Sequence, residues 1–282
     1  MCQDSGVPVA HSRTILDRAV AESRAVAAFN VITLEHAEAI VAGAEKAGSP
    51  VILQLSENAI RFHGGPRAIA AAMVAVAQDA SVEVVLHLDH ITDPALALRT
   101  AELGFSSVMF DGATLPFDEN VTETRRVAEW CHANDIWVEA ELGEVGGKDG
   151  AHAPGVRTDP AEAAEFVAAT GVDALAVAVG SSHAMTEKSA ALDHDLIGRL
   201  RASVPVPLVL HGSSGVPDHE LAEAARSGMV KINIGTALNV AFTGAVRSRL
   251  DEEAKLVDPR KYIAPARDAM AAVVGHALTV LS

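Results

Sequence analysis

The chain has 282 residues, of which 49% are hydrophobic and 4% are aromatic, and its formal net charge is −15 at pH 7. This composition argues against a surface that binds a nucleic-acid backbone or stacks bases, although a few local donors can still hold one phosphorylated small molecule. Neither a signal peptide nor a long apolar run is apparent, and two cysteines (Cys2 and Cys131) do not form a disulfide framework. We therefore expect a cytoplasmic protein that binds neither membranes nor nucleic acids.

Short apolar runs alternate with longer amphipathic stretches along the whole chain. The runs are nearly continuous in apolar character, which is typical of parallel strands that are buried on both faces. We predict eight strands, at Val26–Phe29, Pro50–Leu55, Val82–Leu88, Ser107–Phe110, Ile136–Glu141, Ala174–Val179, Val206–Leu210 and Met229–Ile234.

Helical patterns lie between these runs, and several begin after Asp or at Pro and end before Gly. The predicted helices are Leu34–Ala47, Arg67–Gln78, Pro94–Leu103, Glu119–Ala133, Pro160–Ala169, Asp195–Ala202, Asp218–Ser227, Ala237–Leu250 and Pro265–Leu281. Eight strand–helix units without a linker predict one domain over residues 1–282, an α/β fold in the form of a single (β/α)8 TIM barrel. The glycine-rich segment Leu142–Thr158 is the one long irregular stretch, a length that is usually functional or disordered.

Histidines and carboxylates stand at the carboxyl ends of the predicted strands, where barrel enzymes place their chemistry. These polar residues are His87, Asp89, His90, Asp111, Glu139, Glu141, His183, His211 and Asn233. His90, His183 and His211 follow three different strands, and three neutral imidazoles with an open position make a catalytic Zn²⁺ site. Strand alternation places Asp89 on the opposite face from His90 unless the backbone bends there. No local metal motif is present, so ordinary hydrogen-bonded histidines remain the alternative.

Glycine-containing turns follow the last three predicted strands and open the next helices. They comprise Gly180–Ser182, His211–Gly215 (HGSSG) and the pair Gly235-Thr236. Backbone N–H groups at such turns can face an anion, and the loops after strands seven and eight of barrels often bind phosphate. Ordinary strand-to-helix turns are the alternative interpretation.

These residues belong to ordered motifs that cover nearly the whole chain. The motifs are AFNVITLEHAEAI (28–40), SPVILQLSENA (49–59), HLDH (87–90), FSSVMFDGA (105–113), VEAELGEVGG (138–147), LAVAVGSSH (175–183), LVLHGSSGVP (208–217), KINIGT (231–236) and DPRKYIAPARDAM (258–270). Together they resemble the class II, zinc-dependent fructose-bisphosphate and tagatose-bisphosphate aldolases.

The resemblance implies a role for each matching residue. The zinc ligands would be His90, His183 and His211, and the acidic residues near the metal would be Glu141 and Asp111. Asp89 resembles the acid/base, Asn233 positions the reaction intermediate, and Arg260 is a candidate for the distal phosphate. The remaining substrate contacts would come from Asn30, Ser56, Gly212, Ser214 and Thr236. A monovalent cation (Na⁺ or K⁺) near the phosphate and a homodimer or homotetramer are also implied.

The implied activity is that of an aldehyde-lyase in glycolysis and carbohydrate metabolism. It would reversibly cleave fructose 1,6-bisphosphate to dihydroxyacetone phosphate and glyceraldehyde 3-phosphate. Cleavage leaves a carbanion beside a carbonyl, and Zn²⁺ can stabilise the resulting enediolate as a Lewis acid while Asp89 takes the C4 hydroxyl proton. Three alternatives remain: an aldolase for tagatose bisphosphate or another ketose phosphate, a catalytically weak sugar-phosphate-binding relative, and an enzyme with a Schiff-base lysine at Lys231.

Two positions depart from the pattern of the family. Relatives commonly carry an acidic pair after the Gly-Gly of the long loop, whereas this chain has Lys148 and Asp149. Asp149 can still supply a catalytic carboxylate, on a shorter side chain. The family usually has Gly after the second ligand and a Lys shortly beyond, whereas this chain has Ala184 and then Lys188, one position late. Both departures bear on the identity of the substrate more than on the reaction.

Overall fold

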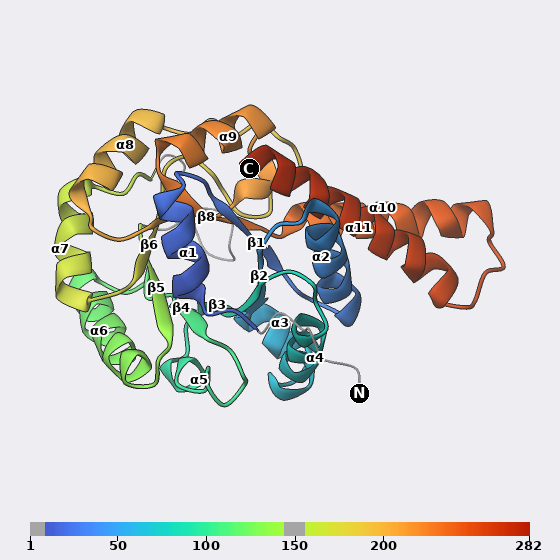
Figure 1. Cartoon of the computed structure of the whole chain (residues 1–282), viewed down its shortest axis with the longest axis horizontal. Coiled ribbons are helices and arrows are strands. Elements are labelled where there is room, and N and C mark those ends of the chain that lie inside the picture. The colour runs from blue at the N-terminus through green and yellow to red at the C-terminus, as the bar shows by residue number, and fades with distance from the viewer. Residues whose placement is uncertain (1–8, 144–155) are drawn as a thin grey trace.

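Eight parallel strands form a closed barrel in the computed structural model of the chain, which describes residues 9–143 and 156–282 (Figure 1). The strands are hydrogen-bonded in the order of the sequence, β1 to β8, and the helices surround them. The predicted (β/α)8 barrel is thus confirmed. The strands are β1 Val26–Asn30, β2 Val51–Ser56, β3 Val84–Ile91, β4 Ser107–Phe110, β5 Trp137–Leu142, β6 Ala174–Val177, β7 Leu208–Leu210 and β8 Met229–Ile234.

Helices connect successive strands and cover the outside of the barrel (Figure 1). They are α1 Ser12–Ala21, α2 Leu34–Ala47, α3 Glu57–Phe62, α4 Arg67–Gln78, α5 Pro94–Ala97, α6 Phe117–Ala133, α7 Pro160–Thr170, α8 His194–Ser203, the 3₁₀ turn η1 Ser213–Gly215, α9 Asp218–Ser227, α10 Thr236–Glu252 and α11 Arg260–Leu281. In the described part of the chain, no helix is both long enough and apolar enough to cross a bilayer.

Four helices differ from the prediction. Neither α1 nor α3 was expected, and the helix predicted to run from Pro94 to Leu103 is only four residues long before it gives way to turns. Pro265 was expected to start the last helix but lies inside α11, which begins at Arg260. Proline is best tolerated in the first turn, so a start at Pro265 was the simpler expectation.

Helix α1 closes the amino-terminal end of the barrel. Its residues Ile15, Leu16 and Ala19 are buried and pack with the inward-facing side chains of the strands, among them Trp137 of β5. Packing of small and branched side chains fills the interior of such barrels. Because this end is closed, ligand access is restricted to the opposite end, where the carboxyl ends of the strands lie.

The last two helices, α10 and α11, extend away from the barrel as an antiparallel pair (Figure 1). Leu238 at the start of α10 is the buried residue of that helix, whereas Val240 is half exposed. Val257 in the connection between the two helices is 87% exposed. The tip of the pair therefore adds little to the barrel core, whereas α11 packs on the barrel through the buried residues Met270 and Val274.

Cys131 lies buried on the inner face of α6, and we predict that its thiol is inert in the folded protein. Burial, with a contribution from the Asp173 carboxylate, raises the pKa of the thiol to about 12. At pH 8 the reactive thiolate is then only about 10⁻⁴ of the population, because each pH unit below the pKa reduces it tenfold. In a Cys2→Ser variant, Ellman's reagent should modify about one thiol in guanidinium and none in native buffer. Rapid labelling of the native protein would contradict this.

Candidate metal and substrate site

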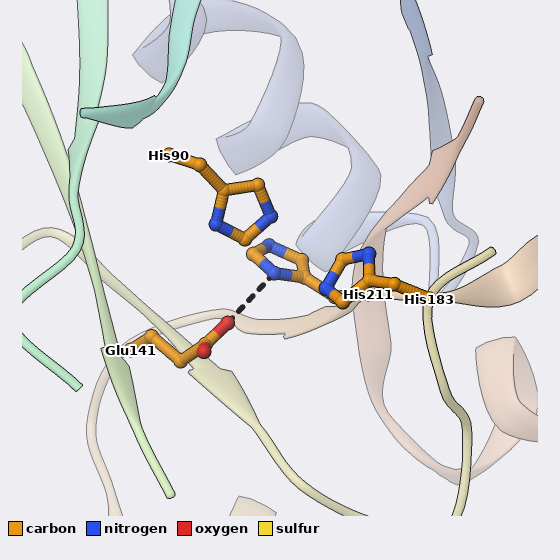
Figure 2. A group of neighbouring side chains, drawn as sticks. All are labelled: His90, Glu141, His183 and His211. Carbon is orange, nitrogen blue, oxygen red and sulfur yellow. Dashed lines mark ion pairs between the residues drawn. The ribbon is translucent and has the colours of Figure 1, made fainter. Parts of the chain in front are cut away.

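Four side chains at the carboxyl end of the barrel form a cluster with the composition of a metal site. One ligand atom from each of His90, Glu141, His183 and His211 lies within 4.8 Å of each of the others. The ring centroid of His90 is 4.6 Å from that of His211 and 5.0 Å from that of His183. Figure 2 shows the three rings and Glu141 facing one another. Three imidazoles and one carboxylate suit Zn²⁺ in both number and chemistry. The described residues thus fit a divalent metal of this kind.

A bend in β3 brings Asp89 and His90 to the same mouth of the barrel. The pairing of β3 with β4 shifts register between Leu88 and Ile91, and His90 has a φ of 49° in the left-handed region. Regular alternation would have separated the two side chains, but an irregularity of this kind redirects one of them. The two side chains were expected on opposite faces unless the backbone bends between them, and the structure contains such a bend.

Carboxylates orient two of the three imidazoles. Asp111 Oδ2 lies 2.8 Å from His90 Nδ1. His211 Nε2 lies 2.9 Å from Glu139 Oε1, and its Nδ1 lies 2.8 Å from Glu141 Oε2 (Figure 2). Carboxylate–histidine–metal arrangements fix the tautomer and the direction of the ring. Asp111, predicted as an acidic residue near the metal, thus lies against His90 and outside the four-residue cluster, whereas Glu141 is in it.

The charge state of His211 follows from its two acidic neighbours. Burial by itself lowers the pKa of this imidazole, but the hydrogen bonds and charges of Glu139 and Glu141 outweigh burial and raise its pKa to about 9. The metal-free ring is therefore protonated at neutral pH. A metal that binds at Nδ1 has to displace this proton, so binding is coupled to proton release.

Asp89 is held ionised beside the metal cluster with one oxygen available. Its Oδ2 accepts a 2.7 Å hydrogen bond from Asn30 Nδ2, and Asn30 Oδ1 accepts one of 3.2 Å from Gln54 Nε2. Oδ1 of Asp89 is buried and has no hydrogen-bond partner among the described residues. Burial alone would raise the pKa of Asp89, but the charges of His90, Lys231 and His211 hold it below its usual range. The available oxygen is thus an ionised acceptor that can meet a substrate hydroxyl.

The turns after β7 and β8 are joined to each other at the mouth of the barrel. Gly212 adopts the left-handed conformation, and Ser214 Oγ accepts a 3.1 Å hydrogen bond from the backbone N–H of Ala237. Thr236 is the first residue of α10, so it stands at the amino end of a helix. Free N–H groups at such an end favour a phosphate. The arrangement is compatible with the predicted phosphate site, which remains a prediction.

Other predicted substrate residues differ in their placement. Ser56 ends β2 and caps α3, where its Oγ accepts from Ala59 N at 3.2 Å. Asn233 is buried on β8, and both polar atoms of its amide have no hydrogen-bond partner among the described residues, which leaves them for a ligand. Arg260 is the first residue of α11 and donates to the Asp258 carboxylate just before that helix. Asp149 lies outside the described residues.

The segment that departs from the family pattern has its own local structure. Ala184 adopts a φ of 58°, a left-handed conformation that costs a residue other than glycine about 1–2 kcal/mol. Lys188 pairs with Asp218 of α9, which also accepts a 2.7 Å hydrogen bond from His276 Nε2. Lys188 is thus engaged in an ion pair, and its use as a phosphate ligand would require this pair to break.

The sequence analysis assigned no site role to Gln54 or Glu139, and it considered Lys231 only as a Schiff-base nucleophile. Lys231 is 1% exposed and donates to Glu139 Oε2 at 2.8 Å, so it is an ion-paired ammonium. A signal for the pair was present in the sequence: Glu139 and Lys231 are charged residues inside otherwise apolar strands, and each shares a face with a site residue two positions later.

We predict that Gly212→Ala damages the site. A Cβ at this position would stand 2.5 Å from the backbone carbon of Ser182 and 3.0 Å from the amide nitrogen of His183, and the residue has a φ of 66°. The loop that carries His183 would have to move, so zinc affinity should fall at least about 10-fold and unfolding free energy by about 1–3 kcal/mol. Gly198→Ala, where a Cβ meets open space, is the control. Chelator competition measures the zinc affinity and thermal melts measure the stability. Unchanged zinc affinity would refute the prediction.

Comparisons with known proteins give a consistent result. The family model "Fructose-bisphosphate aldolase class-II" matches residues 10–282. The fructose-bisphosphate aldolase of Thermus caldophilus is 41% identical, with 92% of this chain and 93% of the relative covered, and that of Geobacillus stearothermophilus is 40% identical, with 93% of each covered. The crystal structure of the YdjI aldolase from Escherichia coli K12 has a TM-score of 0.85 at 32% identity and covers 97% of both chains. A putative fructose-1,6-bisphosphate aldolase from Coccidioides immitis has a TM-score of 0.86 at 31% identity, with 96% of each chain covered.

Proposed function

The chain belongs to the class-II fructose-bisphosphate aldolase family, and on this premise we propose that it cleaves fructose 1,6-bisphosphate to dihydroxyacetone phosphate and glyceraldehyde 3-phosphate. The family consists of zinc-dependent aldehyde-lyases that act on phosphorylated ketoses. The observation that carries the proposal is the cluster of His90, Glu141, His183 and His211 beside the ionised Asp89.

His90, His183 and His211 would hold the zinc, with Glu141 as a further or alternative ligand. The bound cation supplies Lewis-acid stabilisation for negative charge on the substrate oxygens. Asp111 fixes the orientation of the His90 ring through its 2.8 Å contact with Nδ1. The directions of His90 and His211 are thus set by carboxylates of the barrel, so little reorganisation of these two rings is needed when the substrate binds.

Asp89 Oδ1 takes the proton from the C4 hydroxyl in cleavage and returns it to the aldehyde oxygen in condensation. Asn30 holds the other oxygen of this carboxylate, which fixes its direction. Asn233 orients the three-carbon fragment through its amide, which has no partner among the described residues. Protonation on carbon needs a second acid, and Asp149 of the long loop is our candidate.

Phosphate recognition is assigned to Gly212, Ser214 and Thr236, with Ser56 and Asn30 at the neighbouring strand ends and Arg260 for the distal phosphate. A Na⁺ or K⁺ ion near the phosphate would complete this region. We also propose that the protein is a homodimer or homotetramer, which sedimentation of the purified protein will decide. Tagatose bisphosphate, or another ketose phosphate, is the alternative substrate.

A coupled assay over a panel of ketose phosphates tests the proposal. We expect zinc-loaded protein to cleave fructose 1,6-bisphosphate, EDTA to abolish the activity, and added Zn²⁺ to restore it. Borohydride with substrate should leave the protein unmodified, because Lys231 is buried and ion-paired. Trapping of substrate on Lys231 with EDTA-resistant activity would overturn the metal mechanism. Cleavage of a different ketose phosphate alone would leave the reaction intact and replace the substrate.

A further inference from the structure

A buried chain of polar contacts lies beneath the metal cluster and crosses the inside of the barrel. Lys231 Nζ on β8 donates to Glu139 Oε2 on β5 at 2.8 Å, and Glu139 Oε1 lies 2.9 Å from His211 Nε2. The exposed fractions of Lys231, Glu139 and His211 are 1%, 0% and 0%. The two oxygens of one carboxylate therefore serve two different partners, both of which are buried.

Burial of these charged groups inside the barrel costs free energy. Each buried ion loses its hydration, and replacement of a buried ion pair by apolar side chains of similar volume is often neutral or stabilising. The neighbouring interior residues include Val85, Ala176 and Val209, so an aliphatic filling is available to this fold. The pair is thus better explained by an effect on His211 than by stability.

Glu139 determines which nitrogen of His211 faces the cluster. A carboxylate can only accept, so the 2.9 Å contact requires a proton on Nε2. When a metal displaces the proton between Nδ1 and Glu141, which are 2.8 Å apart, the lone pair of the neutral ring is therefore on Nδ1. Lys231 neutralises the buried carboxylate and holds its second oxygen, which fixes the direction of Glu139 toward His211.

We propose that Glu139 and Lys231 are positioning residues that fix His211 as an Nδ1 ligand of the zinc. This inference rests on the function proposed above, and neither residue needs to touch the substrate. It implies that the pair acts on zinc affinity and on the tautomer of His211, with an effect on kcat through the metal and little effect on KM.

Two double variants and one control separate positioning from stability. Glu139→Leu with Lys231→Met removes both charges and the acceptor, whereas Glu139→Gln with Lys231→Met keeps an amide oxygen that can accept from Nε2–H. Thr170→Val is the control, because it removes a buried 2.7 Å hydrogen bond to Phe166 O on α7 and leaves Glu139 and His211 in place.

Zinc dissociation constants are measured by competition with a chromophoric chelator, alongside melting temperatures of the metal-free proteins. We expect the Leu/Met variant to bind zinc about 10–100-fold more weakly, the loss typical for a supporting contact of a metal ligand, and the Gln/Met variant to recover much of that affinity. The control should match the wild type. Equal affinity of the wild type and the Leu/Met variant would overturn the proposal, as would a Gln/Met variant no better than Leu/Met.

A measurement on the wild type keeps the proposal testable if the Leu/Met variant does not fold. In zinc-loaded protein with ¹⁵N-labelled histidine, the His211 signals, identified by their absence from His211→Gln, should report a proton on Nε2 and metal on Nδ1. The reverse assignment would overturn the positioning role. A wild type that binds no zinc would instead refute the proposed function itself, so the two failures are distinguishable.

Discussion

His211→Ala is expected to abolish stoichiometric zinc binding and detectable aldol cleavage. His211 is fully buried at the centre of the cluster, with its ring centroid 4.6 Å from that of His90 and 5.8 Å from that of His183. Its loss leaves His90, His183 and Glu141 and removes the 2.8 Å contact of His211 Nδ1 with Glu141 Oε2, so the remaining donors are no longer oriented toward one cation. Without the Lewis acid, the charge that develops on the substrate oxygens is stabilised by no cation in the cluster.

The variant should remain folded, because Glu139 keeps its 2.8 Å ion pair with Lys231 when the ring is removed. Metal content by atomic absorption after dialysis, turnover in the coupled assay and a thermal melt are the three measurements. His219→Ala is the matched control, since that side chain is 80% exposed and lies in the next helix. A folded His211→Ala protein that still carries one zinc per chain would show that the imidazole is not a ligand.

The barrel was predictable from the sequence because parallel strands buried on both faces leave a strong apolar signal. β4 and β8 have the predicted bounds, whereas β7 and β6 are shorter than predicted. Pro207 has no N–H for a ladder bond, so β7 starts at Leu208. The end of β6 is set by Thr158, whose Oγ1 accepts from Ala178 N at 2.8 Å. That partner lies twenty residues away in the sequence, and no local pattern indicates it.

The candidate ligands were predictable for a different reason. Once the fold is known, the exits of the strands meet at one mouth, so His90, His183 and His211 could be brought together by position alone. Their supporting carboxylates could not be assigned in the same way, because contacts such as Glu139 with Lys231 join strands that are distant in the sequence and depend on which way each side chain turns. The bend at His90 likewise arises from a register shift against β4. Side-chain contacts between strands that are distant in the sequence therefore cannot be predicted from its periodicity.

Asp89→Asn is expected to reduce kcat for cleavage by about 10²-fold or more while zinc stays bound, because a positioned acid–base group contributes on that scale. The amide is isosteric and its oxygen can still accept from Asn30 Nδ2, which is 2.7 Å from Asp89 Oδ2 in the wild type. What is lost is the basic atom: the buried Oδ1, which has no partner among the described residues, is replaced by a group that cannot take the C4 hydroxyl proton.

The comparison of kcat with metal content makes this prediction specific to proton transfer. Asp135→Asn, at a position where the wild-type carboxylate is 99% exposed, controls for the general effect of removing one negative charge. Zinc stoichiometry should be equal in the wild type and both variants, so that any loss of rate belongs to the step that follows binding. A change in kcat of less than about twofold would remove Asp89 from the mechanism, since a general base contributes far more than that. Loss of zinc together with activity would instead make Asp89 part of the metal site, a role that its absence from the four-residue cluster argues against.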